Sequence, residues 1–400
     1  MKVLTVFIDG LKPESIQYMP FLDSFSTKRR IRTELGYSNP CHASMYTGVH
    51  PNKHLKWFIW KYSPSTSPFK WIKKFKLDKF PHNLYTKYAC YRIAKFFNRD
   101  ITSFYGMPFM YWIPIKNWHY FDLAEKKFWS DSNFIENYPT IFDLLRINNI
   151  PYEVVGMERK HANESSKIIE QHIFNGAKKP WTYLFIGDID PLSHKYGQNS
   201  IQVRERLKKI DKILEKTYTS FEKKFDNFCF MLFSDHGHIK VESKIDLKSF
   251  FRDCGRSLND YIYFIDSNYA RFWFRNEKEQ EEVTRILLEM GDKGFILTEE
   301  HFKKYNVNMP DNRYGDLIFY LDTPHQFDRG QITVMGKQRT TSDVSAHGYL
   351  PEYPDSDGVF ISNKNVVNDS HIQLVDIAPS IMDILGIKIP NYIDGKIIWR

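Results

Sequence analysis

Cysteine is scarce in this chain, and no two cysteines have the spacing of a metal-binding or redox motif. The 400 residues contain four cysteines, at Cys41, Cys90, Cys229 and Cys254. Small secreted domains that depend on disulfides are much richer in cysteine, and a Cys-x-x-Cys motif needs two of them three positions apart. The sequence therefore excludes a disulfide framework and favours a reducing compartment.

Long apolar runs are also missing. A helix that crosses a bilayer needs roughly 20 mostly apolar residues, and no stretch of the sequence approaches that length. The first residues, MKVLTVFIDG, lack the basic, apolar and small-residue segments of a secretion signal and predict a buried strand instead. We therefore expect a soluble, cytoplasmic protein, with peripheral attachment to a membrane as the alternative.

Aromatic residues and positive charge are what the sequence has in excess. Aromatic residues make up 16% of the chain, and 56 Lys and Arg residues against 48 acidic residues give a net charge of +8. A mild positive field favours anionic partners such as phosphates, nucleic acid or acidic lipid headgroups. The length suffices for one large α/β domain with a cap, or for two domains.

Short apolar stretches alternate with helical patterns over most of the chain. Strands are predicted at residues 1–8, 32–35, 152–155, 181–186, 228–233 and 316–320, and helices at residues 201–221 and 277–290. This alternation predicts an α/β fold with a mixed, mostly parallel central sheet and helices on both of its faces.

The segment from about residue 53 to 135 has a different character. Residues 53–117 contain thirteen Lys or Arg residues but only two acidic ones, and their many aromatic residues follow no clear period. We interpret 53–135 as a cap inserted into a domain formed by 1–52 and 136–400. The cap either carries merely solvated lysines, or recognises a phosphorylated glycan, lipid or nucleotide, or attaches the protein to a membrane. In the second case Trp57, Phe58 and Trp60 would stack on a base or sugar.

Potential metal ligands follow the predicted strands in four separate places. They are Asp9, the pair Asp190 and His194, the pair Asp235 and His236, and His347. Loops that leave the carboxyl ends of parallel strands meet at one edge of a sheet, so we expect these side chains to converge. Aspartate and histidine suit Zn²⁺, with Mn²⁺ as a competitor, and two such ions can clamp a phosphoryl group during displacement.

The order of these motifs resembles the type I phosphodiesterase/nucleotide pyrophosphatase family of the alkaline phosphatase superfamily. The matching segments are VFIDG, the nucleophile segment SNPCHASMYTG, DPLSH, SDHG and HGY, and the tail VDIAPSIMDILGIKIPNYIDGK. The resemblance covers residues 1–54 and about 180–398 and implies an alkaline-phosphatase-like three-layer sandwich. No motif of the family matches the basic aromatic segment.

The resemblance also implies roles for individual residues. It places one metal ion on Asp190, His194 and His347, and the other on Asp9, Asp235, His236 and the oxygen of Ser38. Ser38 would be the catalytic nucleophile and would form a covalent phosphoryl or nucleotidyl intermediate that water then hydrolyses. Ser38 precedes a helix that is predicted from Pro40 towards Gly48, so the first N–H groups of that helix could face the phosphate oxygens.

Three positions depart from the family pattern. The nucleophile is Ser where the family mostly has Thr, and Ser193 replaces the glycine of D-x-x-G-H; both changes are chemically mild. Ile59 stands where many nucleotide pyrophosphatases have an asparagine that binds a phosphate oxygen. Lys56 and Lys61 are the candidates to replace that asparagine.

Other functions explain less of the sequence. Cys41 invites comparison with sulfatases, but the order Pro-Cys-His-Ala does not fit their C-x-P-x-R motif, so Cys41 is interpreted as a packing residue. His238 is interpreted as a structural or solvated residue, with substrate contact as the alternative. A nucleic-acid binding module would leave the Asp and His set unexplained.

The sequence therefore predicts a metal-dependent phosphodiesterase or nucleotide pyrophosphatase with two divalent ions. A transferase that moves a phospho-substituent onto a glycan or lipid is the alternative, followed by a phosphomonoesterase. The expected partner is a small phosphate ester or pyrophosphate, with a glycan or lipid phosphate as the other option.

Overall fold

The computed structural model describes residues 1–76, 84–97, 110, 113–156, 165–173, 179–328, 331–334, 337–340, 343–366 and 371–399. The chain divides into two compact units. Unit 1 consists of Met1–His54, Trp129–Lys240 and Asp343–Arg400, and unit 2 of Leu55–Phe128 and Val241–Ser342. Each unit is therefore built from segments that are far apart in the sequence.

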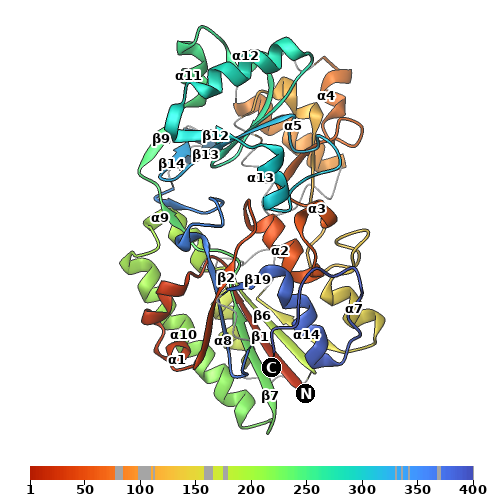
Figure 1. Cartoon of the computed structure of the whole chain (residues 1–400), viewed down its shortest axis with the longest axis vertical. Helices are drawn as coiled ribbons and strands as arrows, with labels where there is room; N and C mark the ends of the chain where they lie inside the picture. The colour runs from red at the N-terminus through yellow and green to blue at the C-terminus, as the bar shows by residue number, and fades with distance from the viewer. Residues whose placement is uncertain are drawn as a thin grey trace. The chain divides into compact units, whose positions relative to one another are not determined.

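Unit 1 is organised around a seven-stranded sheet (Figure 1). All neighbouring strands are parallel except at β18, which is antiparallel to both of its neighbours. The strands in spatial order are β19 (His371–Gln373), β2 (Thr27–Arg32), β18 (Gly358–Ser362), β7 (Phe228–Phe233), β1 (Lys2–Ile8), β6 (Trp181–Ile186) and β5 (Tyr152–Val155). The mostly parallel sheet predicted from the sequence is confirmed.

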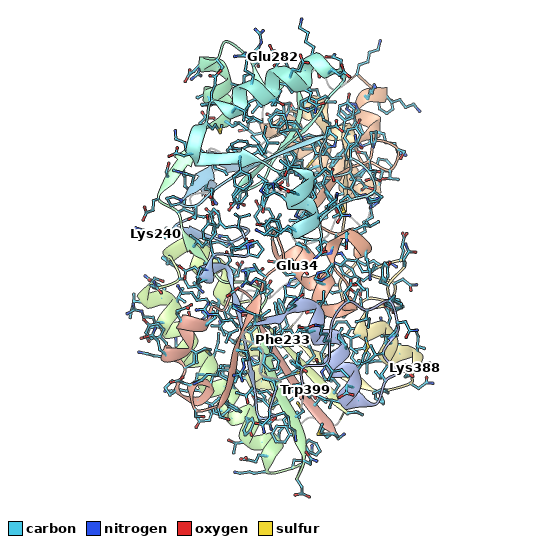
Figure 2. All side chains as sticks on the ribbon, in the orientation of Figure 1. Glu34, Phe233, Lys240, Glu282, Lys388 and Trp399 are labelled. Atoms are coloured by element: carbon cyan, nitrogen blue, oxygen red, sulfur yellow. The ribbon has the colours of Figure 1, made fainter. Side chains whose placement is uncertain are left out.

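The sheet is buried because helices cover both of its faces. Every residue of β6 and β7 is buried, as expected for parallel strands that have no solvent-facing side. Side chains fill the space on either side of the sheet (Figure 2), and Phe233 at the end of β7 is 1% exposed. One helical layer contains α1 (Pro20–Asp23), α8 (Ser165–Ile173), α9 (Ile189–Tyr196) and α10 (Ile201–Glu222), and the other contains α2 (Ser38–Thr47), α7 (Ile141–Ile147) and α14 (Ile377–Leu385).

The amphipathic pattern of α10 explains its place in the first of these layers. Its buried residues include Val203, Leu207, Ile210 and Leu214, which recur three or four positions apart and so form one face of the helix. Ser200 caps the helix by accepting a hydrogen bond from the N–H group of Val203. The prediction of a helix at 201–221 is confirmed to within one residue.

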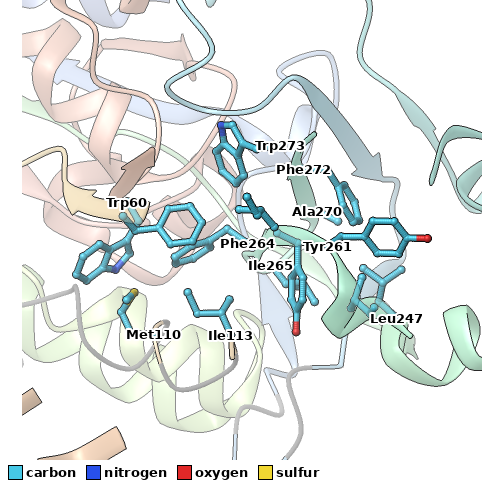
Figure 3. Close-up of a cluster of buried hydrophobic side chains, with 14 of the residues drawn as sticks. Trp60, Met110, Ile113, Leu247, Tyr261, Phe264, Ile265, Ala270, Phe272 and Trp273 are labelled. Atoms are coloured by element: carbon cyan, nitrogen blue, oxygen red, sulfur yellow. The ribbon is translucent and has the colours of Figure 1, made fainter. Parts of the chain in front are cut away.

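Unit 2 contains a four-stranded antiparallel sheet and an aromatic core. The strands in spatial order are β10 (Ile262–Ile265), β11 (Tyr269–Trp273), β13 (Leu317–Leu321) and β12 (Gly294–Ile296). Figure 3 shows Trp60, Phe264 and Trp273 in the cluster of buried side chains that the sheet helps to form. The helices of this unit are α4 (Lys70–Lys74), α5 (Leu84–Phe97), α11 (Leu247–Asp253), α12 (Glu277–Leu288) and α13 (Glu299–Lys304).

Four two-stranded ribbons complete the described structure. In unit 1, β8 (Ile239–Lys240) pairs with β17 (Ser345–Ala346). The ribbons of unit 2 are β3 (Trp60–Tyr62) with β4 (Phe121–Leu123), β9 (Ser243–Ile245) with β14 (His325–Phe327), and β15 (Gln331–Val334) with β16 (Lys337–Thr340).

The extent of unit 2 differs from the inserted cap expected at 53–135. Val241–Ser342 joins Leu55–Phe128 in unit 2, whereas the sequence analysis assigned 241–342 to the catalytic domain. The reason is the shared core, in which β3 and β4 pack against β10 and β11. The strand predicted at 316–320 corresponds to β13 and lies in this second sheet, not in the central one. The strand predicted at 32–35 is wrong in its bounds, because β2 covers Thr27–Arg32 and residues 33–35 are not in a strand.

Two further findings concern the absences noted in the sequence. All four cysteines lie in described parts of the chain and are free thiols. No described helix combines the length and the apolar character of a transmembrane span.

Candidate metal centre

Three neighbouring parallel strands bring the acidic residues to one edge of the central sheet. β1 lies between β6 and β7, and it is in register with both of them up to their last residues. Asp9 directly follows β1, Asp235 follows β7 after a single serine, and Asp190 lies in the first turn of α9 after β6. The convergence predicted from strand ends therefore occurs, because parallel strands end at the same edge.

One group of potential ligands forms around Asp9. The carboxylate oxygens Asp9 Oδ1 and Asp235 Oδ2 lie 3.5 Å and 3.2 Å from His236 Nε2. Ser38 Oγ lies 3.0 Å from the same nitrogen. The structure thus brings together all four residues that the resemblance assigned to one metal ion.

The second group forms around Asp190. His194 lies one helical turn after Asp190 on α9, and its Nε2 is 3.4 Å from Asp190 Oδ1. His347 comes from the end of β17, and its Nε2 is 3.6 Å from the same oxygen. Ligand atoms of these three residues all lie within 4.8 Å of one another, as do those of Asp9, Asp235 and His236. The rings of His236 and His347 stack with centroids 3.8 Å apart, so the two groups adjoin.

The hydrogen bonds of two histidines leave their other ring nitrogens as lone-pair donors. His236 Nδ1 faces the carbonyl oxygen of Gly237 at 3.1 Å, and His194 Nδ1 faces that of Ser345 at 3.1 Å. A carbonyl only accepts, so each Nδ1 carries the proton and each Nε2 presents a lone pair to carboxylate oxygens. Such a meeting of lone pairs is repulsive without a cation between them, and it is the usual arrangement of histidine ligands.

Buried carboxylate oxygens give a second indication that the residues fit metal ions. Among the residues that the structure describes, Asp9 Oδ1 and Asp235 Oδ2 have no hydrogen-bond partner although both are buried. A buried oxygen without a partner costs free energy, and a coordinated cation removes that cost. The set of three aspartates, three histidines and a serine therefore fits a pair of divalent ions such as Zn²⁺.

Burial, with a smaller contribution from neighbouring carboxylates, raises the pKa values of Asp9 and Asp235. Burial raises the pKa of Asp235 to about 8, and the nearby charge of Asp190 adds to this effect. The pKa of Asp9 is raised well above its usual value by burial and then by Asp235 and Asp190.

Ser38 is the first residue of α2, a ten-residue helix that is almost entirely buried. It therefore lies in the first turn of that helix, whose N–H groups have no partner within the helix itself. These groups and the helix dipole favour an anion such as a phosphate. The helix predicted to follow Ser38, with Pro40 in its first turn, is present, but it begins at Ser38 itself.

His238 belongs to the cluster although the sequence analysis favoured a structural or solvated role. Its side chain is fully buried, and its Nε2 lies 3.0 Å from Asp190 Oδ1. Ligand atoms of Asp190, His236 and His238 also lie within 4.8 Å of one another. The available signal was that His238 comes only two residues after His236, in a loop already assigned to the site.

The comparisons with known proteins agree with this geometry. The model of the family named "Type I phosphodiesterase / nucleotide pyrophosphatase" matches residues 3–350. The chain belongs to this family. It is accordingly an enzyme of the alkaline phosphatase superfamily, as its motifs indicated. A search of curated protein sequences found no match.

Solved structures of this family have the same fold. Human ectonucleotide pyrophosphatase/phosphodiesterase 5 aligns with a TM-score of 0.67 and 14% identity, over 99% of this chain and 97% of that one. The murine protein of the same name, solved as an inactive variant in complex with AMP, aligns with a TM-score of 0.68, 14% identity and the same coverage. These likenesses confirm the predicted α/β fold of this family member.

Several residues expected near the substrate lie in unit 2. Trp57, Phe58 and Trp60 are at most 1% exposed and belong to the interior of that unit, so the proposal that these rings stack on a base or sugar is wrong. Their apolar surface is already covered by partners such as Tyr269 and Phe264. Ile59 packs against the same core.

The predictions for Lys56, Lys61 and Cys41 remain to be compared with the structure. The ammonium group of Lys56 donates a hydrogen bond to the carbonyl oxygen of Ala124, also in unit 2. Its role as a replacement for the family's asparagine, and that of Lys61, stay predictions. Cys41 is fully buried, which confirms its interpretation as a packing residue.

Proposed function

We propose that this chain hydrolyses phosphodiester or nucleotide pyrophosphate bonds through a covalent intermediate on Ser38, at a pair of divalent ions. The observation that carries the proposal is the convergence of Asp9, Asp190 and Asp235 with imidazole nitrogens at one edge of the central sheet. Three carboxylates so close together need cations, and family membership gives those cations a phosphoryl-transfer role.

The residues divide between the two ions as their contacts suggest. Asp9, Asp235, His236 and Ser38 Oγ would hold one ion, and Asp190, His194 and His347 the other. When bound, such ions lower the pKa of a coordinated hydroxyl or water and neutralise charge on the phosphoryl oxygens. Aspartate and imidazole ligands favour Zn²⁺, with Mn²⁺ as the alternative.

Ser38 then acts as the nucleophile of a two-step displacement. Its Oγ loses its proton and forms a bond to phosphorus while the bond from phosphorus to the leaving oxygen breaks, and that oxygen takes up a proton from solvent. In the second step the oxygen of a water molecule attacks phosphorus, the bond from phosphorus to Ser38 Oγ breaks, and a proton from water restores the Ser38 hydroxyl. The N–H groups at the start of α2 would bind phosphate oxygens through both steps.

A nucleotide is the substrate class that the comparisons favour. The murine relative was solved with AMP, and the family name includes nucleotide pyrophosphatases. The test compares hydrolysis of bis-p-nitrophenyl phosphate, p-nitrophenyl phosphate and a dinucleoside polyphosphate by the metal-loaded chain. We expect the diester and the polyphosphate to be cleaved faster. Preference for the monoester would contradict the proposal and favour a phosphomonoesterase.

The Ser38→Ala variant tests the nucleophile. We expect turnover to fall by at least about 10³-fold, because loss of a nucleophile removes the covalent route. Metal content, measured by mass spectrometry of the purified chain, should stay near two ions. The matched control is Ser24→Ala, since Ser24 is exposed at the end of α1 and should leave turnover unchanged. Retained activity in Ser38→Ala would show that another group attacks phosphorus.

A transferase differs from a hydrolase in the molecule that accepts the phospho-group from Ser38. If water is the natural acceptor, adding a glycan or lipid alcohol during turnover should leave the yield of the hydrolysed phosphate product unchanged. A cytoplasmic location, peripheral membrane contact and a capping role of 53–135 stay predictions. Cell fractionation tests the first two, and labelling by a photoreactive nucleotide tests the third.

A further inference from the structure

We propose that His238 is a direct ligand of the metal ion at Asp190, in addition to the three ligands that the sequence motifs indicate. This inference rests on the proposed two-metal function but adds a residue to it. The side chain of His238 is fully buried, and its Nε2 lies 3.0 Å from Asp190 Oδ1. That nitrogen is nearer to Asp190 than the ring nitrogens of His194 and His347 are.

The hydrogen bonds around Ser345 decide which nitrogen of His238 carries the proton. Ser345 Oγ donates its only hydrogen to the carbonyl oxygen of Ser193, at 2.7 Å. His238 Nδ1 lies 3.4 Å from the same Oγ, so it can bond only by donating to it. The proton of the neutral ring is therefore on Nδ1, and Nε2 presents a lone pair toward Asp190.

A lone pair directed at a carboxylate oxygen needs a cation between the two atoms. The same argument applies to His194, whose Nδ1 donates to the carbonyl oxygen of Ser345. Ser345 thus orients two histidines, one through its backbone and one through its side chain. Metal-bound histidines usually have such a partner on their other nitrogen.

The backbone around His238 holds the ring in this place. β8 begins directly after His238 and pairs with β17, which contains Ser345 and immediately precedes His347. On the other side, a Cβ atom at Gly10 would lie 3.0 Å from His238 Nε2 and 3.3 Å from Asp190 Cβ. Glycine avoids these tight contacts and readily adopts the φ of +71° found here, so the turn after β1 is compatible with a ring at this position.

A fourth protein ligand changes what the ion at Asp190 can do. Catalytic zinc ions usually have three protein ligands and one open position. With His238 bound, a substrate or water oxygen must join as a fifth ligand, which zinc sites adopt in some transition states. The ion at Asp190 would then have four protein ligands, as many as the ion held by Asp9, Asp235, His236 and Ser38.

The decisive experiment is a crystal structure of the full chain loaded with zinc, with data collected at the zinc absorption edge. We expect His238 Nε2 about 2.0–2.1 Å from one zinc ion, which Asp190 also binds. A separation of more than about 3 Å from both ions would overturn the inference, since it exceeds any zinc–nitrogen bond. Absence of zinc from the whole cluster would instead contradict the proposed function.

Metal affinity, measured by competition with a coloured chelator, tests the same point in solution. Glutamine at position 238 can still donate a hydrogen bond to Asp190 but is a poor metal ligand. We therefore expect His238→Gln to weaken one of the two ions by at least about 100-fold, beyond the usual cost of losing a hydrogen-bonded supporting residue. Unchanged affinity in a folded His238→Gln chain would show that His238 only donates a hydrogen bond.

Two further variants control for indirect effects. Ser345→Ala removes the acceptor of His238 Nδ1 but keeps the backbone carbonyl that orients His194, so one ion should weaken by about 10-fold to 100-fold. His371→Gln changes a partly exposed histidine on β19 and should leave both affinities unchanged. If His238→Gln does not fold, the zinc-loaded structure of the unaltered chain still decides the question.

Discussion

At the scale of single residues, the interior of unit 2 contains a buried cation. Arg271 has no exposed surface, and its guanidinium donates hydrogen bonds to Asp266 and to the carbonyl oxygen of Trp60. The rings of Phe58 and Phe264 lie 4.3 Å and 4.8 Å from its central carbon. The many aromatic residues inside unit 2 are thus partly explained by a buried cation, which two of their rings contact.

Removing this cation should destabilise unit 2 strongly. Arg271→Met leaves the buried carboxylate of Asp266 without its ion pair, which typically costs about 3–5 kcal/mol. The measurement is the free energy of unfolding in urea, followed by tryptophan fluorescence. The double variant Arg271→Met with Asp266→Asn should recover part of the loss, because no unpaired charge is then buried. A loss of less than about 1 kcal/mol in the single variant would contradict the argument.

At the scale of secondary-structure elements, helix α7 begins with a reciprocal capping arrangement. Thr140 Oγ1 accepts a hydrogen bond from the N–H group of Asp143, and the Asp143 carboxylate accepts one from the N–H group of Thr140. The same carboxylate accepts bonds from Asn133 and Arg146. Burial acts to raise the pKa of Asp143, but these hydrogen bonds together hold it below the usual 3.8.

Asp143→Asn should therefore destabilise the protein in a pH-dependent way. Near neutral pH we expect a loss of about 1 kcal/mol, the usual size of a capping effect. Because the folded-state pKa is lowered, the stabilisation is present above the unfolded pKa and is lost as the pH falls through the folded value. The difference in unfolding free energy between wild type and variant should shrink below about pH 4. A difference that grows in acid would show that the carboxylate is not the stabilising form.

The elements near the site could largely be predicted from the sequence. Strands β1, β6 and β7 are continuous apolar runs, so their bounds followed from composition alone, and Asp9, Asp190 and Asp235 followed from the loops after them. His238 could not be assigned in the same way. Its role depends on the pairing of β8 with β17, two residues each, which has no signal in local composition.

At the scale of the whole molecule, the two units have separate hydrophobic cores. The cluster around β10 and β11 contains only residues of unit 2, and the cluster around β1 and α10 only residues of unit 1. All proposed metal ligands belong to unit 1. Metal binding should therefore stabilise one unit directly and the other at most indirectly.

Removal of metal by a chelator should expose this difference in a calorimetric scan. We expect two unfolding transitions, of which the one assigned to unit 1 moves to higher temperature when zinc is restored. Zinc at 100 times its dissociation constant adds about 2.7 kcal/mol for each ion bound only by the folded state. The transition of unit 2 serves as the internal reference, and Asp9→Asn should remove about half of the zinc-dependent shift, the part due to the ion that Asp9 binds. A single transition that moves as a whole would mean that the two units unfold together.

The family, the central sheet and seven of the residues in the proposed site were accessible from the order of short motifs along the chain. That order carries information because a strand's apolar run and the ligand after it are adjacent in sequence, and parallel strands end at a common edge. The composition of unit 2 and the place of His238 depended on the folded chain. Both result from packing between segments distant in sequence, namely 55–128 with 241–342 and β8 with β17, and long-range pairing of this kind leaves no local pattern to read.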